Sequence, residues 1–410
     1  MIANQPPLSY CTNVHAGIDL DSIEGNLDQF ATEVRQRLAE SHGIARLGVG
    51  LWIPDLASRQ LTGSRLDAFK EFIESRQFEA LTINGFPFDN FHGQHVKQRV
   101  YLPTWAEADR LDYTCRLAEI LSAILPAEQM LGSISTLPLG WPDNPFADSP
   151  SEGKQPITEV AGSKLRELAR FLKSLHERCG KKIVVAIEPE PGCWLDTADD
   201  VIQFFDRELA DAKDRDYISV CHDICHSVVM NESQRDVLRR YKNAGVPIGK
   251  VQVSSAIVVP WDEIDVSEHA VTLKQLREFA EDRYLHQTGR IDQSGHFDLS
   301  EDLPDLLRSV DDPASPITDR SWRIHFHVPI FLESFGRLKT SRSAVLDCVE
   351  ALSEPDIEAN FTGHLEVETY AWTVLPPEWR QRGLAADIAG EVGWLQDQLS
   401  VQVSKNRAKR

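Results

Sequence analysis

The sequence predicts an α/β fold, a (β/α)8 TIM barrel with an insertion between late strands. First, short apolar segments alternate with amphipathic ones along the 410 residues, a pattern typical of β-α units whose parallel strands close into a barrel. Second, the first predicted strand is followed by a single glycine rather than by G-x-G-x-x-G, and no Walker-type phosphate loop occurs. Both absences disfavour an open doubly wound sheet. Third, residues 260–322 are too long and polar for an ordinary connection.

Nine segments have the length and apolar character of strands, and helical stripes separate several of them. The predicted strands are 8–15, 45–54, 78–87, 130–140, 182–191, 217–226, 250–259, 323–331 and 364–372. Helices are predicted over 21–38, 164–179 and 196–209, because apolar residues recur there every three or four positions. Eight strands complete a barrel, so one of the nine can belong to the insertion. We expect a single domain over 1–410, with 260–322 as an insertion or lid.

Composition limits the class of protein and its partners. The chain carries 43 Lys and Arg against 63 Asp and Glu, a formal charge of −20, which disfavours a nucleic-acid partner. The first residues lack a basic and apolar leader, and no run of about 18 apolar residues predicts a transmembrane segment. Seven scattered cysteines suit reduced thiols. These features predict a cytoplasmic protein, for which an oligomer is possible.

Acidic side chains are predicted at the ends of two barrel strands. Along 182–188, Glu188 shares the inward row with two small residues, and the following proline ends the strand. Along 217–223, Asp223 ends the equivalent row, and His226 lies three residues further on. Barrel active sites are built at this rim, so both acids are candidate functional residues. Glu190, two residues further on, is better explained than Glu188 as an ordinary loop carboxylate.

The stretch "CHDICH" (221–226) is neither a haem attachment nor a closed zinc site. Haem attachment requires C-x-x-C-H, and here the two cysteines are one residue too far apart. A Cys/His zinc site needs a second ligand pair, which the sequence does not offer. Cys221 and Cys225 are therefore expected to be packing residues.

Two later strands add imidazoles and carboxylates. His325 and His327 share one face of 323–331, and Glu366 and Glu368 share one face of 364–372. One histidine on an apolar strand is usually a core residue, but two on one face, with carboxylates on other strands, favour a site. Gln252 occupies the inward row of its strand, where it can orient ligand hydroxyls or fill the barrel.

Together these side chains form an oxygen-rich set that suits Mn²⁺, Mg²⁺, Co²⁺ or Zn²⁺. The predicted ligands are Glu188, Asp223, His325, His327 and Glu368. A divalent metal ion with open positions polarises a carbonyl or diol, and a neighbouring carboxylate can then remove a proton as an enediolate develops.

Three motifs resemble the strand-end motifs of the xylose isomerase-like TIM barrels, the sugar isomerase and epimerase superfamily. They are "IEPEPG" (187–192), "HDICH" (222–226) and "EVETY" (366–370), and the resemblance covers most of the chain. The segments "LSYCTNVHAG", "RIHFHVPIF" and "LEVETYAWTVLP" more narrowly resemble the EboE branch, described as metabolite traffic proteins.

The resemblance implies a role for each matching residue. It makes Glu188 a metal ligand and possible base, Asp223 a metal ligand, His226 a substrate contact, and Glu368 a metal ligand and second base. Gln252 departs from the family pattern, since many sugar epimerases have a histidine ligand there. Either this glutamine is a weaker oxygen ligand, or His325 or His327 replaces the missing imidazole.

The leading functional hypothesis is a metal-dependent isomerase or epimerase of a sugar, sugar phosphate or cyclitol-like metabolite. The alternative is a non-catalytic component that binds a polyol or similar metabolite in an export or processing pathway. A third class, a zinc endonuclease of the same superfamily, is disfavoured by the charge of −20 and by the shortage of ligands for a three-metal cluster.

Overall fold

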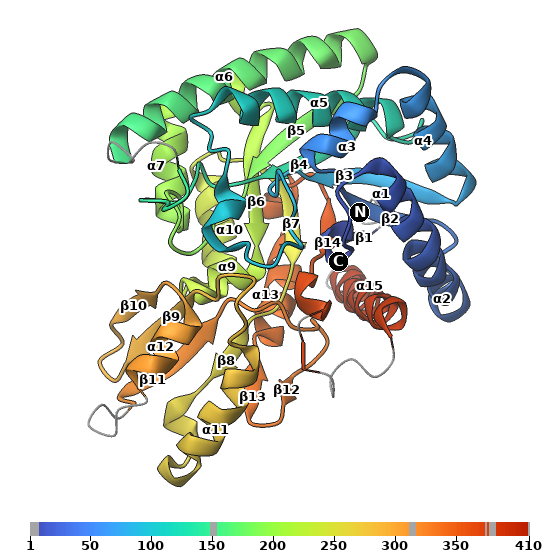
Figure 1. Ribbon diagram of the computed structural model, residues 1–410. Helices are drawn as coiled ribbons and strands as arrows, with labels where there is room; N and C mark the ends of the chain where they lie inside the picture. The colour runs from blue at the N-terminus through green and yellow to red at the C-terminus, as the bar shows by residue number, and fades with distance from the viewer. Residues whose placement is uncertain (1–7, 148–153, 311–316, 374, 377–382, 409–410) are drawn as a thin grey trace.

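The chain forms a closed barrel of eight parallel strands with helices between them (Figure 1). This computed structural model describes residues 8–147, 154–310, 317–373, 375–376 and 383–408. The barrel strands are β1 (Ser9–Cys11), β2 (Leu47–Trp52), β3 (Phe78–Asn84), β4 (Leu131–Thr136), β5 (Lys182–Ile187), β6 (Ile218–Asp223), β7 (Ile248–Val253) and β14 (Leu365–Val367). They follow one another around the barrel, and β14 closes against β1. The predicted (β/α)8 TIM barrel is confirmed.

Amphipathic helices cover the outside of the barrel. Those between barrel strands are α1 (Leu20–Asn26), α2 (Thr32–His42), α3 (Asp55–Gln60), α4 (Gly63–Ser75), α5 (Ala108–Ile124), α6 (Lys154–Cys179), α7 (Ala198–Glu208), α8 (Ala212–Arg215), α9 (Ile224–Val229), α10 (Gln234–Asn243), α13 (Arg342–Leu352) and α14 (Pro355–Glu358), and α15 (Leu384–Ala408) follows the last strand. A π-helical turn, Leu27–Ala31, joins α1 to α2. The helices predicted over 21–38, 164–179 and 196–209 correspond to α1 with α2, to α6 and to α7. No helix in the described part of the chain is long and apolar enough to cross a bilayer.

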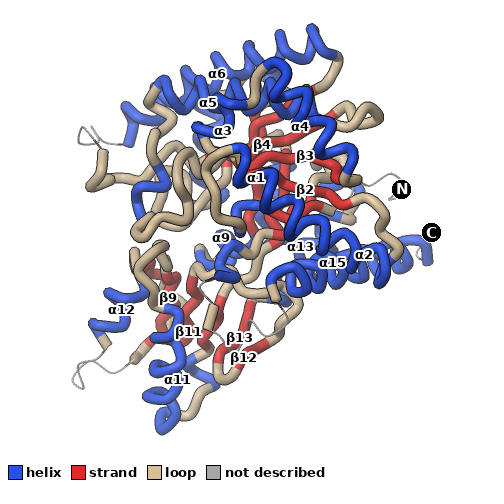
Figure 2. The backbone as a smooth tube through the Cα atoms, turned by 45° about the vertical axis from the view of Figure 1, so that its right-hand side comes forward, coloured by secondary structure: helices blue, strands red, loops and turns tan. Residues whose placement is uncertain are grey.

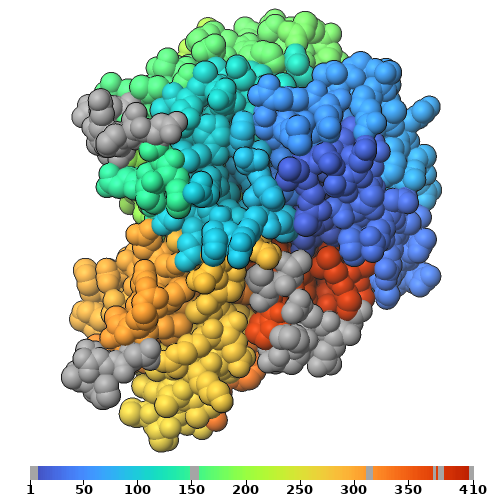
Figure 3. Space-filling model, viewed as in Figure 1, coloured from blue at the N-terminus to red at the C-terminus, as the bar shows by residue number. Residues whose placement is uncertain are grey.

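A second sheet of six antiparallel strands interrupts the barrel between β7 and β14. Its strands are β8 (Ile257–Val259), β9 (Thr288–Asp292), β10 (Phe297–Ser300), β11 (Asp319–Ile324), β12 (Ser334–Phe335) and β13 (Leu338–Thr340), in the order β10-β9-β11-β8-β13-β12. Two helices, α11 (His269–Leu276) and α12 (Leu303–Ser309), accompany it. The second sheet lies to one side of the barrel, with α9 where the two meet (Figure 2). In the space-filling view these residues, yellow to orange, form a separate lobe (Figure 3).

The predicted strand 323–331 is not a barrel strand. It begins within β11, which pairs antiparallel with β8 and β9 in the second sheet. Regular pairing ends at Ile324, and the chain then turns back toward the barrel. The alternation of histidines with Phe326 and Val328, both fully buried, therefore reflects burial on two sides of an irregular segment rather than a strand. A period-two pattern cannot distinguish these cases.

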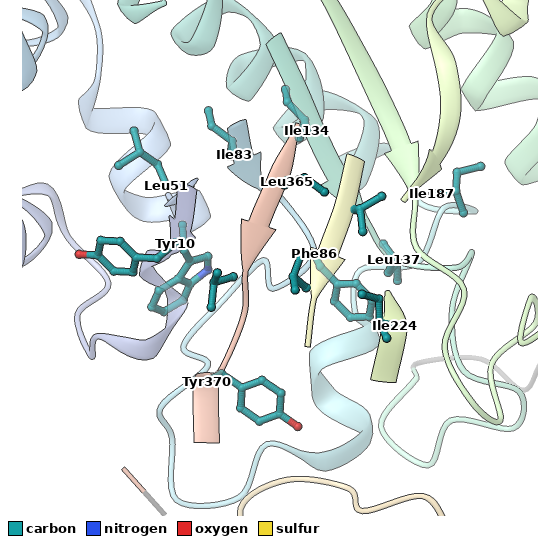
Figure 4. Close-up of a cluster of buried hydrophobic side chains, with 14 of the residues drawn as sticks. Tyr10, Leu51, Ile83, Phe86, Ile134, Leu137, Ile187, Ile224, Leu365 and Tyr370 are labelled. Carbon is teal, nitrogen blue, oxygen red and sulfur yellow. The ribbon is translucent and has the colours of Figure 1, made fainter. Parts of the chain in front are cut away.

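The barrel interior contains one fully buried ion pair. Lys250 Nζ lies 2.8 Å from Glu366 Oε1, and both side chains are wholly inaccessible to solvent. Gly50 makes room for this pair, since a Cβ there would collide with the Glu366 carboxylate. Thr82 Oγ1 donates to the other carboxylate oxygen. Buried apolar side chains surround the strands, with Tyr370 beyond the end of its own strand (Figure 4).

Candidate metal centre

Three carboxylates meet at the carboxyl ends of the barrel strands. Glu188 directly follows β5, Asp223 is the last residue of β6, and Glu368 directly follows β14. Each offers an oxygen within 4.8 Å of those of the other two, and all three side chains are buried. The structure thus brings together the three acids whose strand-end positions predicted a common site.

Asp223 is held by the loops that follow β6 and β7. Its Oδ1 accepts hydrogen bonds from the backbone N–H of His226 and from Ser254 Oγ, both at 2.8 Å. The first of these bonds caps the N-terminus of α9. Because both bonds use the same oxygen, Oδ2 is left facing the other carboxylates without a partner.

Glu368 is held by two asparagines that the sequence analysis did not single out. Its Oε1 accepts from Asn13 Nδ2 at 2.8 Å and from Asn84 Nδ2 at 2.9 Å. Asn13 follows β1 and Asn84 is the last residue of β3. Both lie at strand ends, as the acids do, but nothing in the sequence distinguishes them from ordinary turn asparagines.

His327 approaches the carboxylates from the second sheet. Its Nδ1 donates to the backbone carbonyl of Glu368 at 2.8 Å. A carbonyl only accepts, so this bond fixes the tautomer and leaves the Nε2 lone pair free. That Nε2 lies 3.9 Å from Asp223 Oδ2. Burial lowers the pKa of His327 to about 4, so the ring is neutral and able to act as a ligand.

His325 faces another histidine rather than the carboxylates. Its Nδ1 donates to Gln287 Oε1 at 2.6 Å, and its Nε2 lies 3.2 Å from Nε2 of His226. His226 in turn donates from Nδ1 to the carbonyl of Pro189 at 2.8 Å. Burial lowers the pKa of His325 well below its usual value. Of the two histidines predicted to complete the site, His327 is therefore the better placed.

Several buried polar atoms around the three carboxylates have no partner. Within the described residues, no hydrogen bond reaches Glu188 Oε2, Asp223 Oδ2, His327 Nε2, Asn13 Oδ1 or either amide atom of Gln252. Each unpaired buried group costs about 1–3 kcal/mol. Carboxylate oxygens and the neutral imidazole nitrogen are ordinary ligands of divalent cations. The residues present therefore fit a divalent metal ion.

Gln252 lies at the β7 position where a histidine was missing. Its Cα is in register with Asp223 on one side and with Glu366 on the other. The side chain is fully buried and does not line the cavity described below. This position suits a role beneath the carboxylates better than the substrate contact predicted from the sequence.

Burial and mutual repulsion raise the pKa values of two of the carboxylic acids. Burial, with Glu368 and Asp223 adding to it, raises the pKa of Glu188 well above its usual value. Burial, followed by Asp223 and Glu366, raises the pKa of Glu368 to about 8. A divalent cation needs both groups ionised, so its binding must displace protons near neutral pH.

Metal-free protein is expected to lose stability as the pH rises from about 5 to 8.5. Glu188 and Glu368 hold protons in the folded state that they have lost in the unfolded state within this window, so the unfolding free energy falls by a few kcal/mol. Added Mn²⁺ should stabilise more at the upper end. Thermal unfolding with EDTA and with Mn²⁺ measures both effects. Equal slopes for the wild type and a Glu188→Gln/Glu368→Gln double variant would contradict this expectation.

An aromatic cavity of about 60 Å³ opens beside the carboxylates. Glu188, Glu368, His226, His325 and His327 line it, together with Phe86, Phe91, Tyr101, Tyr284 and Tyr370. Apolar ring faces next to a few polar groups are typical of small-molecule sites. The predicted contact residue His226 is therefore in a position to touch a bound molecule.

Glu190 also lines this cavity, although the sequence favoured an ordinary loop carboxylate at this position. Its Oε1 accepts from Tyr101 OH at 2.7 Å and from Gln287 Nε2 at 3.2 Å. Burial raises its pKa above the usual value. Tyr101 and Gln287 come from two different loops, so no spacing in the sequence could have indicated this contact.

Glu391 on α15 connects the two loops that carry His327 and Glu368. Its Oε1 accepts from the backbone N–H of Ile330 at 3.1 Å and from Thr369 Oγ1 at 2.6 Å. Its Oε2 accepts from Trp372 Nε1 at 2.9 Å. This buried carboxylate therefore ties the segment that follows His327 to the segment that follows Glu368.

The fold is similar to that of xylose isomerase-like TIM barrel proteins of known structure. One from Mycobacterium smegmatis, solved in complex with magnesium, is 10% identical with a TM-score of 0.52, and the match covers 97% of this chain and 98% of that one. A D-tagatose 3-epimerase-like protein is 12% identical with a TM-score of 0.50, covering 98% and 99%. An L-ribulose 3-epimerase is 10% identical with a TM-score of 0.50, covering 98% and 97%.

Identities this low establish a shared fold and leave activity open. A scan against protein-family models and a search of curated proteins gave no match. The narrower resemblance to EboE proteins receives no support from these comparisons. Functional assignment must therefore come from the side chains of the site.

Proposed function

We propose that this protein is a metal-dependent isomerase or epimerase of a sugar, sugar phosphate or cyclitol-like metabolite. The observation that carries the proposal is the cluster of three buried carboxylates, Glu188, Asp223 and Glu368. Glu188 and Asp223 each have an oxygen without a partner, and Glu188 and Glu368 line the neighbouring cavity. Burying three acids together is costly unless a cation compensates them. Such a cluster is hard to explain as a structural feature alone.

Proton transfer is assigned to the two carboxylates on non-adjacent strands. A bound divalent ion would supply a Lewis acid that polarises a substrate carbonyl. Glu188 on the β5 side and Glu368 on the β14 side, with β6 and β7 between them, reach the cavity from different directions. One, ionised, can remove a proton from the carbon next to the carbonyl. The other, carrying a proton taken up from solvent, can deliver that different proton to the opposite face of the enediolate.

The second sheet is proposed to act as a cover within a single barrel domain. Tyr284, Leu285, His325 and His327 all belong to the stretch between β8 and β13, and all four line the cavity. The barrel alone would leave this side of the carboxylates open. The covering stretch is longer than the 260–322 predicted from the sequence.

His327→Ala is expected to weaken Mn²⁺ binding by more than about 100-fold, whereas His325→Ala should weaken it by no more than about 10-fold. The reason is that His327 Nε2 points toward Asp223, while His325 Nε2 faces His226. Calorimetric titration of each variant measures the difference. His296→Ala, an exposed histidine of the second sheet, is the matched control. Equal losses of Mn²⁺ affinity in His327→Ala and His325→Ala would contradict the assignment of His327 as the metal ligand.

The test of the proposed function is proton exchange with solvent. Protein stripped with EDTA and reloaded with Mn²⁺ is incubated in D₂O with a panel of ketoses, aldoses and keto-cyclitols. We expect deuterium to enter one carbon next to the carbonyl of at least one compound, only in reloaded protein. Metal-loaded protein that exchanges no proton in any of them would favour the alternative, a metabolite-binding component of an export or processing pathway.

A further inference from the structure

The cavity beside the carboxylates is small. Its volume of about 60 Å³ is well below the roughly 300–1,000 Å³ typical of small-molecule sites. A larger substrate that reaches Glu188 and Glu368 must therefore extend beyond this space.

A cavity of about 730 Å³, called here the outer cavity, adjoins it. The two share a wall made of Pro87, Phe91 and Val100. The outer cavity lies between the segment that follows β3, the loop after β4 and the first turns of α6. Its volume falls in the range of small-molecule sites.

Apolar side chains make up much of the outer cavity's lining that is not shared with the inner cavity. Phe88, Leu102, Phe146, Ile157 and Val160 line it. Phe146 is 40% exposed and Val160 is 43% exposed. Large apolar side chains left open to solvent beside a functional cavity indicate a binding surface.

The charged groups of the outer cavity disfavour an anionic ligand. Asp89, Glu107 and Asp109 line it, against a single arginine, Arg99. The Arg99 guanidinium lies 3.9 Å from the centre of the Phe146 ring, so this cation is already stacked on an aromatic face. A phosphate there would meet more negative than positive charge.

The shared wall is firmly anchored at both ends. Arg110, fully buried, donates from Nη1 to the carbonyls of Gly85 and Phe86, both at 3.0 Å, and from Nε to the carbonyl of Pro103 at 2.8 Å. On the side of the second sheet, Lys97 Nζ lies 2.6 Å from Asp302. The segment that separates the two cavities is therefore held in place at both ends.

We propose that the outer cavity binds an uncharged apolar substituent of the substrate, an alkyl or aryl group attached to the polyol that reaches the carboxylates. This inference rests on the proposed function and narrows its substrate class to neutral polyols that keep the carbonyl needed for the enediolate and also carry an apolar group through a glycosidic or ether bond. It follows from the small inner space, from the wall that the two cavities share, and from the apolar and acidic lining of the outer cavity.

The test compares n-octyl β-D-glucopyranoside with methyl β-D-glucopyranoside, which differ only in the alkyl chain. Both are titrated calorimetrically into Mn²⁺-loaded protein below the concentration at which micelles form. We expect the octyl compound to bind at least about 10-fold more tightly, since burying two or more methylenes suffices for this. Val160→Glu should remove the preference.

Val266→Glu is the matched control, because Val266 is 79% exposed and lies in the second sheet's connections. It should keep the preference for the octyl compound. Equal binding of the two glucosides, or no binding of either, would overturn the proposal. A preference that survives Val160→Glu would place the alkyl chain elsewhere and also overturn it.

Metal content measured on the same samples separates this inference from the proposed function. Protein that binds no metal but prefers the octyl compound would contradict the isomerase and support the outer cavity as an apolar site. Protein that binds metal at the three carboxylates but shows no preference would contradict only the outer cavity.

Discussion

Replacing Glu368 with glutamine is expected to slow the proposed isomerisation by about 100-fold or more while leaving metal binding detectable. The amide keeps an oxygen and the volume of the side chain, but it cannot take up a proton. Burial, followed by Asp223 and Glu366, raises the pKa of Glu368 to about 8 in the absence of metal, so a bound cation would supply the ionised form that can act as a base. The variant should therefore bind Mn²⁺ yet lose deuterium exchange with solvent.

The measurement is the rate of deuterium incorporation, followed by NMR, with Mn²⁺ affinity determined in parallel. Glu333→Gln is the control, since the Glu333 side chain is 86% exposed and pairs with Arg342 rather than with any residue of the site. Full turnover by Glu368→Gln would refute the assignment of this residue as a base. The site would then depend on Glu188 alone or serve only to bind.

Lys250→Met is expected to lower the unfolding free energy by about 3–5 kcal/mol. Removing the ammonium leaves Glu366 as an unpaired carboxylate in a fully buried position. Although burial opposes it, Glu366 raises the pKa of Lys250 above its usual value, which keeps the ammonium group charged across the ordinary pH range. The loss is large because the surviving charge cannot reach water.

Urea unfolding measures this effect, and two further variants make it specific. Lys250→Met/Glu366→Met removes both charges and should recover much of the lost stability, since an apolar pair needs no compensation. Lys70→Met disrupts an exposed pair with Glu74 on α4 and should cost less than about 1 kcal/mol. A loss below about 1 kcal/mol for Lys250→Met would show that Glu366 is neutral or solvated in the folded protein.

The barrel could be predicted because its signal is local and repeated. Each barrel strand is a short apolar run, and a period of two assigns its inward row, so Glu188, Asp223 and Glu368 could be located from strand ends alone. Closure of parallel strands then requires these ends to share one rim. The structure brings the three together as that reasoning expects.

The path of the histidine segment could not be predicted in the same way. Phe326 and Val328 are fully buried while His325 and His327 face the site, which imitates the alternation of a strand. What distinguishes the segment is its set of irregular backbone bonds, such as His325 N to Gln287 O at 2.8 Å. Those partners are fixed by tertiary structure, which a local pattern does not contain.

Contacts between residues far apart in the sequence could not be predicted either. The inward position of Glu366 was evident, but its pairing with Lys250 depends on the stagger between β7 and β14. Asn13 and Asn84 are single polar residues at strand ends, where asparagine is common without any function. Only the geometry of the closed barrel shows that both donate to Glu368.

Anomalous diffraction from crystals soaked in Mn²⁺ tests whether the three carboxylates hold a metal ion. We expect a peak coordinated by Glu188, Asp223 and Glu368, whose oxygens already lie within 4.8 Å of one another, with His327 as a further ligand. A peak elsewhere with these carboxylates left unbound, or no peak in protein that remains folded, would contradict this expectation.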